Sequence, residues 1–175
     1  VCRRIQGATM TYFIGVDGGG SNLRVVVTDA ALTVVAEQRG DTVNPSVVGW
    51  QEAAARVQKA ILAGISAAGL RASDIAGVGI GIAGASAEYA GAWLHEVVHA
   101  ILPEVHVAAS SDIEIALVGA HGARSGVLVL AGTGSVVLAI DHAGRMTRAG
   151  GWGYLLGDEG GGHWLGIEAL RAVMR

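Results

Sequence analysis

The sequence predicts an α/β fold in which a βββ-α-β-α-β-α (βββαβαβα) domain is followed by the beginning of a second, similar domain. Short apolar runs rich in β-branched residues alternate with longer segments of helical period. An apolar strand, a glycine-rich turn and a second apolar strand follow one another near the start of the chain and again near residue 130. The 175 residues are 51% apolar and 15% charged, which is enough to bury a core. We expect a first domain over residues 10–122 and an incomplete second domain over residues 123–175.

The first domain begins with an expected antiparallel meander. Phe13–Val16 and Leu23–Thr28 are typical of buried strands, and a third strand is expected at Thr33–Gln38. Asp41–Ser46 follows as a polar loop that carries Asn44. The nine residues before Met10 contain no apolar signal-peptide core and are expected to be disordered or a misassigned start.

The rest of the first domain alternates helices with strands. Trp50–Ala68 has helical period and ends at Gly69, whereas Ile75–Ile82 is continuously apolar, as in a strand buried on both faces. Three further elements are predicted, with Ser110 or Ser111 as the cap of the last: a helix at Ser86–Ile101, a strand at Pro103–Ala108 and a helix at Asp112–His121.

The second domain repeats the opening of the first. Val127–Asp158 contains strand, glycine turn, strand and a second glycine-rich loop, and a helix is expected at Gly161–Met174. The copy then stops at Arg175. An unfinished sheet exposes an edge, so association through that edge, as in a homodimer, is a prediction.

Composition excludes several classes of function. The net charge is −3 and no basic run exceeds Arg3-Arg4, which argues against a nucleic-acid partner. Ile75–Ala87 contains no charged residue and is too short for a membrane span, which needs about 20 apolar residues. The single cysteine, Cys2, excludes an internal disulfide and a multi-cysteine metal site, and it favours a reducing, cytoplasmic location.

Two glycine turns are the strongest candidates for binding phosphate. Glycines allow backbone N–H groups to approach an anion closely. In the first turn, Asp17 stands directly before Gly18, Gly19, Gly20 and Ser21, and a carboxylate beside phosphate requires a cation such as Mg²⁺, usually bound through water. The second turn, Gly132-Thr133-Gly134-Ser135, carries hydroxyls instead. Ordinary hairpin turns are the alternative for both.

Asp112 follows a predicted strand and opens a helix, a position suited to a general base that accepts a proton from an attacking hydroxyl. The alternative is a helix N-terminal charge. In the loop Gly150–Gly160, Trp152 is a candidate for packing on a sugar ring, or alternatively a core residue, and Asp158 or Glu159 can accept hydroxyl hydrogen bonds. Gly79–Gly84 matches GxGxxG, with Glu104 about 20 residues later, but follows a meander rather than opening a βαβ unit, which weakens a dinucleotide interpretation.

Four ordered motifs carry a family resemblance: FIGVDGGGSN, SSDIEIALVGAHG, VLVLAGTGS and GGWGYLLGDEGGGHWLG. Together they resemble the N-acetylglucosamine/glucosamine kinase branch of the BadF/BadG/BcrA/BcrD-type ATPase family, which has the ribonuclease H-like actin/sugar-kinase fold. The resemblance covers nearly all of residues 10–175. It implies transfer of the ATP γ-phosphoryl group to the 6-hydroxyl of an amino sugar.

The resemblance also implies roles for residues. It assigns Asp112 as the catalytic base and Asp17 to Mg²⁺. The ATP phosphates would be bound by the two turns, and the sugar by four residues of the loops. The phosphate-binding set is Gly18, Gly19, Gly20, Ser21, Asn22, Gly132, Thr133 and Gly134, and the sugar-binding set is Asn44, Gly151, Trp152 and Asp158.

This chain departs from the family pattern at three places. Asn22 replaces a common lysine or threonine, and Gly161 stands where serine is frequent. The family's adenosine-binding segment lies beyond Arg175. A fragment that binds sugar or nucleotide without turnover is therefore a live alternative. An ATPase activator of a dehydratase or reductase is disfavoured, because such activators hold an iron–sulfur cluster with cysteines.

Overall fold

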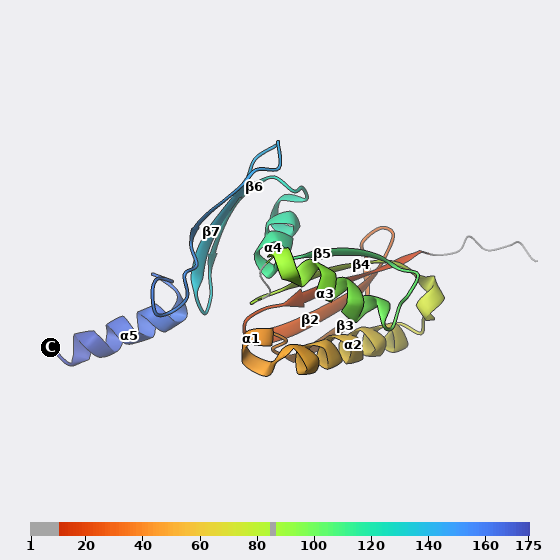
Figure 1. Ribbon diagram of the computed structural model, residues 1–175, viewed down its shortest axis with the longest axis horizontal. Helices are drawn as coiled ribbons and strands as arrows, with labels where there is room; N and C mark the ends of the chain where they lie inside the picture. The colour runs from red at the N-terminus through yellow and green to blue at the C-terminus, as the bar shows by residue number, and fades with distance from the viewer. Residues whose placement is uncertain (1–10, 85–86) are drawn as a thin grey trace, which may run out of the picture. The chain divides into compact units, whose positions relative to one another are not determined.

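The computed structural model describes residues 11–84 and 87–175, so the predicted start at residues 1–9 and Ser86 lie outside the described residues. The chain forms two compact units (Figure 1). The first contains the described residues up to Asp112, and the second runs from Ile113 to Arg175. The sequence predicts the boundary after residue 122 instead, between the third helix of the first domain and the repeated strands.

The first unit is built on a five-stranded sheet with the order β3-β2-β1-β4-β5. The first three strands pair antiparallel, whereas β1, β4 and β5 are parallel to one another. The strands are β1 (Tyr12–Gly18), β2 (Asn22–Asp29), β3 (Val34–Asp41), β4 (Ile75–Ile82) and β5 (His106–Ser110).

The helices of this unit are the short α1 (Pro45–Val48), α2 (Trp50–Ala67) and α3 (Ala87–His99), with a 3₁₀ turn at Ala72–Asp74. Alternate residues of β1, β2 and β4 are buried in one core together with residues of α2 and α3. Gln58 on α2 donates to the carbonyl of Val97 on α3 at 3.0 Å, which joins the two helices. The core contains Ile14, Val16, Leu23, Val25, Val27, Val57, Ile61, Val78, Ile80, Ile82, Leu94 and Val98.

The second unit holds most of α4 (Asp112–His121) and an antiparallel sheet with the order β6-β7-β8. Its strands are β6 (Gly126–Ala131), β7 (Ser135–Ile140) and β8 (Met146–Gly150), and α5 (Gly162–Val173) ends it. Leu117 of α4 packs with Leu138 and Ile140 of β7. That contact explains why the boundary between the compact units falls at the first residue of α4 rather than after the helix.

The same hairpin connection occurs in both units. Between β2 and β3 the Asp29 carboxylate accepts the N–H groups of Ala31 and Thr33, and between β7 and β8 the Asp141 carboxylate accepts those of Ala143 and Arg145, all at 2.9 Å. Each turn contains one residue in the left-handed region, Leu32 (φ 62°) in the first and Gly144 (φ 78°) in the second. Shared turn geometry supports the inference from sequence that the second unit repeats the start of the first.

The mixed α/β fold class is confirmed, while several predicted bounds are wrong. The β1–β2 hairpin is tighter than expected because Asp17 and Gly18 belong to β1. The fifth strand begins at His106 rather than Pro103, in register with β4 from Gly77 onward. The predicted loop Asp41–Ser46 contains the end of β3 and the start of α1. No helix in the described parts of the chain is long and apolar enough to span a membrane.

Candidate functional site

Topology brings several candidate residues of the first unit to one edge of its sheet. Because β1, β3, β4 and β5 run in the same direction, their carboxyl ends share that edge. The segments that follow them are the glycine turn, the loop with Asn44, the Ala83-Gly84 turn and Ser111-Asp112. This is the edge at which open α/β sheets bind ligands.

The first glycine turn is shorter than the sequence indicates. Gly19, Gly20 and Ser21 form the turn, while Asn22 is the first residue of β2. Gly18 is required by packing, since a Cβ there would lie 2.6 Å from Val43 and 2.8 Å from Ile82. A Cβ on Gly20 would meet nothing within 4 Å. The tip of the turn is therefore open to a ligand, while its base is tightly packed.

Asp17 lies at the end of β1, across from Arg24 of β2. Partial exclusion of water by surrounding atoms raises the pKa of the Asp17 carboxyl above its usual range, and the charge of Arg24 opposes this increase. Arg24 is shared, because its Nε lies 3.1 Å from Glu37 Oε1. Arg24 and Arg39 lower the pKa of Glu37 by hydrogen bonding to it. Burial thus disfavours the charged form of Asp17 and Arg24 offsets this only in part, so a bound cation would stabilise the carboxylate.

The donor set at Asp17 suits magnesium better than a metal that needs several protein ligands. Within residues 11–84 and 87–175, no three or more His, Cys, Asp or Glu side chains gather to hold a metal. Mg²⁺ commonly binds through one or two carboxylates, waters and substrate phosphates. A single carboxylate beside an open glycine turn has that composition.

Asn44 has a structural role that the sequence analysis did not predict. Its Oδ1 accepts the N–H of Ser46 at 2.9 Å and caps α1, with Pro45 at the first helical position. Gly84, with φ of 75°, lies directly against the Asn44 amide, and a Cβ at that position would collide with it. The amide NH₂ group is what Asn44 can offer to a sugar hydroxyl.

Asp112 is the first residue of α4, is half-buried, and is separated from the end of β5 by Ser111 alone. The predicted strand-to-helix position is therefore correct, although Ser110 lies within β5 and only Ser111 directly precedes the helix. Glu114 is buried, at 8% exposure, and its Oε1 accepts from Arg124 at 2.5 Å. The ion pair that buried Glu114 makes with the exposed Arg124 gives Glu114 a structural role within the second unit.

The second glycine turn is fixed by the start of α5. Gly162 donates its N–H to the carbonyl of Gly132 at 2.8 Å, and His163 donates to that of Thr133 at 3.2 Å. A Cβ on Gly161 would lie 2.7 Å from the carbonyl carbon of Gly134. The presence of Gly161 where the family frequently has serine therefore has a steric explanation, because a serine side chain has no room there unless the turn moves.

One hydroxyl of the second turn, that of Ser135, makes a hydrogen bond within the second unit. Ser135 Oγ donates to the carbonyl of Glu159 at 2.8 Å. Asp158, in the left-handed region with φ of 63°, accepts the N–H of Gly153 at 3.3 Å, and its carboxylate lies where a Cβ on Gly134 would be. The predicted sugar residue Asp158 thus directly contacts the predicted phosphate turn of its own unit.

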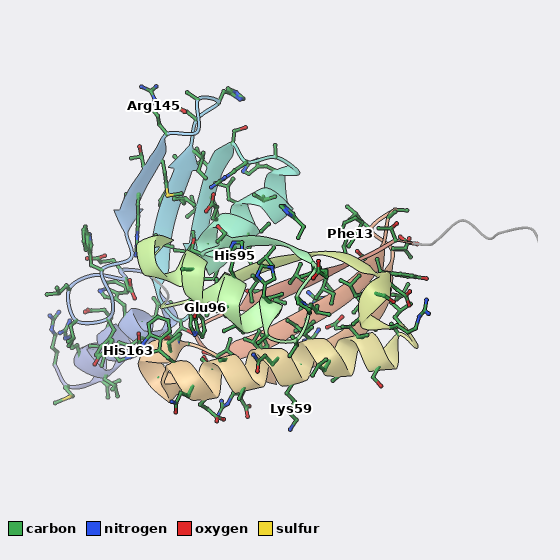
Figure 2. All side chains as sticks on the ribbon, turned by 45° about the vertical axis from the view of Figure 1, so that its right-hand side comes forward. Phe13, Lys59, His95, Glu96, Arg145 and His163 are labelled. Carbon is green, nitrogen blue, oxygen red and sulfur yellow. The ribbon has the colours of Figure 1, made fainter. Side chains whose placement is uncertain are left out.

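The loop after β8 leaves its aromatic residue accessible. Trp152 is 73% exposed, so the alternative that it is a core residue is wrong. Gly151 has φ of 67°, and its carbonyl accepts a hydrogen bond from Arg148. Tyr154 and His163, which lies in the first turn of α5 (Figure 2), make an edge-to-face ring contact with centroids 5.0 Å apart. An exposed indole beside polar backbone groups is suited to a sugar ring.

The dinucleotide interpretation of GxGxxG is wrong. Gly79 and Gly81 lie inside β4 and pair with β1 and β5, rather than forming a strand-to-helix turn. Their N–H groups belong to the sheet and are not gathered around an anion.

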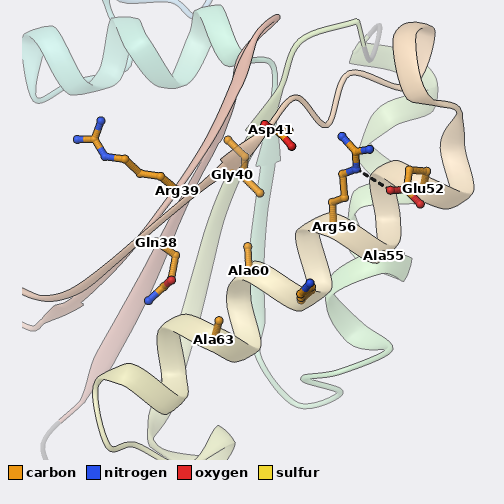
Figure 3. Close-up of a pocket in the computed structure, with 11 residues that line it drawn as sticks. Gln38, Arg39, Gly40, Asp41, Glu52, Ala55, Arg56, Ala60 and Ala63 are labelled. Atoms are coloured by element: carbon orange, nitrogen blue, oxygen red, sulfur yellow. Dashed lines mark hydrogen bonds and ion pairs between the residues drawn. The ribbon is translucent and has the colours of Figure 1, made fainter.

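A separate groove of about 550 Å³ lies between β3 and α2 (Figure 3). It contains none of the predicted site residues. Arg39, Arg56 and Lys59 contribute positive charge and Asp41 and Glu52 negative charge. Lys59 is exposed and extends from α2 (Figure 2). The mixed charge and open shape do not select a ligand class.

Sequence comparison connects this geometry to known proteins. The sequence model of the BadF/BadG/BcrA/BcrD ATPase family matches residues 14–175. An N-acetylmuramic acid/N-acetylglucosamine kinase of Clostridium acetobutylicum is 31% identical over 95% of this chain and 54% of its own length. The glucosamine kinase GspK of Vibrio cholerae is 30% identical over 94% of this chain and 55% of its own. The chain spans about half the length of these curated relatives.

Structure comparison gives the same result for the fold. A structure from Chromobacterium violaceum, provisionally assigned as an N-acetylglucosamine kinase, aligns with a TM-score of 0.76 and 33% identity. The alignment covers 95% of this chain and 58% of the Chromobacterium violaceum chain. A ROK hexokinase from Thermus thermophilus aligns with a TM-score of 0.61 and 22% identity over 94% of this chain and 65% of that one, which shows a shared fold.

Proposed function

Because the chain belongs to the BadF/BadG/BcrA/BcrD ATPase family, we propose that it forms the substrate-binding part of an ATP-dependent amino-sugar kinase. The proposed reaction transfers the γ-phosphoryl group of ATP to the 6-hydroxyl of N-acetylglucosamine or glucosamine, in line with the activities of the relatives. The observation that carries the proposal is the shared sheet edge, where the first glycine turn, Asn44 and Asp112 follow strands of the same direction.

In the proposed site, the backbone of Gly18–Asn22 binds ATP phosphate oxygens, and the open tip at Gly20 gives them room. Asp112 accepts the proton of the sugar hydroxyl as that oxygen attacks phosphorus, and ADP leaves. The amide of Asn44 orients the sugar. Positioning and compensation of charge, rather than covalent catalysis, supply the rate in such reactions.

Magnesium fits the proposed site through Asp17, directly or through water. When bound, it would supply positive charge to the phosphate oxygens. The raised pKa of Asp17 supports this role, because a carboxylate that is poorly compensated by protein gains most from an added cation.

The second unit has candidate binding residues of its own. Gly132, Thr133 and Gly134 form a second turn for phosphate, and the exposed ring of Trp152 is available to pack on the sugar. Gly151 and Asp158 are proposed as polar sugar contacts. The proposed use of ATP agrees with the cytoplasmic location expected from the single cysteine.

The proposal is tested by measuring ADP release from Mg-ATP with N-acetylglucosamine, glucosamine and glucose, each against a blank without sugar. Sugar-dependent ADP release, with the product identified as the 6-phosphate by ³¹P NMR, is the expected result. Binding of sugar without any turnover would favour the alternative of a non-catalytic fragment, which the neutral Asn22 in place of a cation also favours. ATP hydrolysis independent of sugar would instead point to an activator-type ATPase.

A further inference from the structure

One hydroxyl group joins the two predicted binding elements of the first unit. Thr42 lies between β3 and α1, and its Oγ1 donates to the carbonyl of Gly19 at 3.3 Å and accepts the N–H of Asn44 at 3.1 Å. Gly19 belongs to the proposed phosphate turn, and Asn44 is a proposed sugar contact. We propose that Thr42 is a positioning residue that fixes the phosphate turn and the sugar-binding amide relative to each other.

The backbone of Thr42 is itself held from α2. Arg56 Nη1 donates to the Thr42 carbonyl at 3.0 Å. Arg56 Nε lies 2.7 Å from Glu52 Oε1, one helical turn earlier (Figure 3). Because α2 packs through residues such as Val57 into the core, the hydrogen bond from Arg56 ties the Thr42 loop to a helix that is itself held in place.

Packing below the loop leaves it little freedom to move alone. Val43 is fully buried, and its side chain fills the space beside Gly18. Ala83 donates its N–H to the Gly18 carbonyl at 2.7 Å, and Gly84 lies against the Asn44 amide. The phosphate turn, the Thr42 loop and the turn after β4 therefore form one packed cluster.

Of the two bonds of the Thr42 hydroxyl, the one from the Asn44 N–H is closer to ordinary length, and the one to Gly19 is long for an O–H···O bond. Asn44 is held on the other side by the bond of its Oδ1 to Ser46. Removing the hydroxyl leaves the Asn44 N–H without its acceptor and the turn without its link. With the hydroxyl in place, the phosphate turn and the Asn44 amide are linked. On the proposed kinase function, we therefore expect sugar and ATP each to bind more tightly to the wild-type protein when the other ligand is present.

The test compares Thr42→Val, which keeps the side-chain shape, with Thr42→Ser, which keeps the hydroxyl. Thr28→Val on β2 is the matched control, since it makes the same change in a half-buried strand position. Hydrogen exchange of the Asn44 amide should be faster by about tenfold in Thr42→Val, from loss of one hydrogen bond, and near wild type in the other two.

The second measurement is calorimetric binding of N-acetylglucosamine and of Mg-ATP, each alone and with the other ligand present. Thr42→Val should lower the affinity for each ligand several-fold and abolish the increase in affinity that each ligand gives the other. Thr42→Ser should retain that increase. If Thr42→Val does not fold, Arg56→Gln should give the same changes in smaller measure, with Lys59→Gln on the same helix as its control.

Unchanged exchange at Asn44 in Thr42→Val, or faster exchange with the mutual effect of the ligands intact, would overturn the positioning role. If the longest natural form of the polypeptide binds neither ligand, the proposed kinase function is refuted. In that case the amide exchange of Thr42→Val and Thr42→Ser alone decides whether Thr42 joins the two elements.

Discussion

Gly161→Ala should destabilise the second unit although the backbone at this position is ordinary for alanine. Gly161 has φ of −71° and ψ of 160°, so no left-handed strain arises. An added Cβ would lie 2.7 Å and 2.8 Å from two backbone atoms of Gly134 and 3.0 Å from the carbonyl oxygen of Asp158. These neighbours are backbone atoms, so the turn itself must move.

The expected magnitude follows from two opposing effects. Overpacking against fixed atoms costs about 1–3 kcal/mol. Replacement of glycine by alanine in a compatible conformation returns about 0.4–1 kcal/mol by restricting the unfolded chain. The net loss of unfolding free energy should therefore be about 1–2 kcal/mol, and Gly161→Ser should behave alike.

Hydrogen exchange of the Gly162 and His163 amides in increasing urea is the direct assay, because both donate to the second glycine turn. Gly166→Ala is the matched control, since a Cβ there meets nothing within 4 Å and alanine favours the interior of α5 by about 1 kcal/mol. A Gly161→Ala variant as stable as Gly166→Ala would refute the steric argument, and with it the explanation of the glycine at this position.

Three further predictions follow from other parts of the chain. Because the pKa of Asp17 is raised in the folded state, its contribution to the free energy of unfolding is present near pH 3.8 and below and is lost as pH rises through the folded pKa. In urea titrations without Mg²⁺, Asp17→Asn should therefore be more stable than wild type at pH 7 but not at pH 3.5. Equal differences in stability at both pH values would contradict this. Leu32→Gly should raise the urea midpoint by relieving a left-handed backbone at a side chain that is 75% exposed, with a gain of about 0.5–1 kcal/mol, while Gly144→Ala at the equivalent turn should lower it. Light scattering should detect a dimer formed through the open edges of the β6-β7-β8 sheet, and a monodisperse monomer would count against that association.

Local patterns predicted the strands and long helices because each follows from the period of its apolar residues. The α2 helix was predicted to within one residue, since its apolar face and Gly69 mark both its core side and its end. Helix α1 was missed, although Asn44 followed by Pro45 is a local cap signal that can identify it. A helix of four residues is too short to show a helical period of apolar residues, so the polar sequence predicts a loop there.

The bounds of β1 and β5 depended on contacts that sequence does not display. Asp17 and Gly18 extend β1 because they pair with β2 on one side and β4 on the other. The β5 strand reaches Ser110 because Gly81 of β4 pairs with it. Strand ends of this kind are set by partners that are distant in sequence.

In the candidate site, too, features set by local sequence were predictable and features set by contacts between distant residues were not. The position of Asp112 at a strand-to-helix junction was predictable from the order of elements. The link through Thr42 was not, because a threonine in a polar loop has no local signature of a bridging hydroxyl. Likewise, the need for glycine at residue 161 arises from the backbone of Gly134, which lies 27 residues earlier in sequence (161 − 134).

The central claim is that Asp112 is the base of a sugar kinase, and the most direct measurement is the turnover of Asp112→Asn beside its affinity for sugar. The assay should use both this chain and the longest natural form of the polypeptide, with N-acetylglucosamine, glucosamine and glucose. We predict that kcat falls by about 10²–10⁴-fold while sugar still binds, because only proton transfer is removed. Undiminished turnover in Asp112→Asn, or no turnover of any sugar by the longest form, would contradict the account.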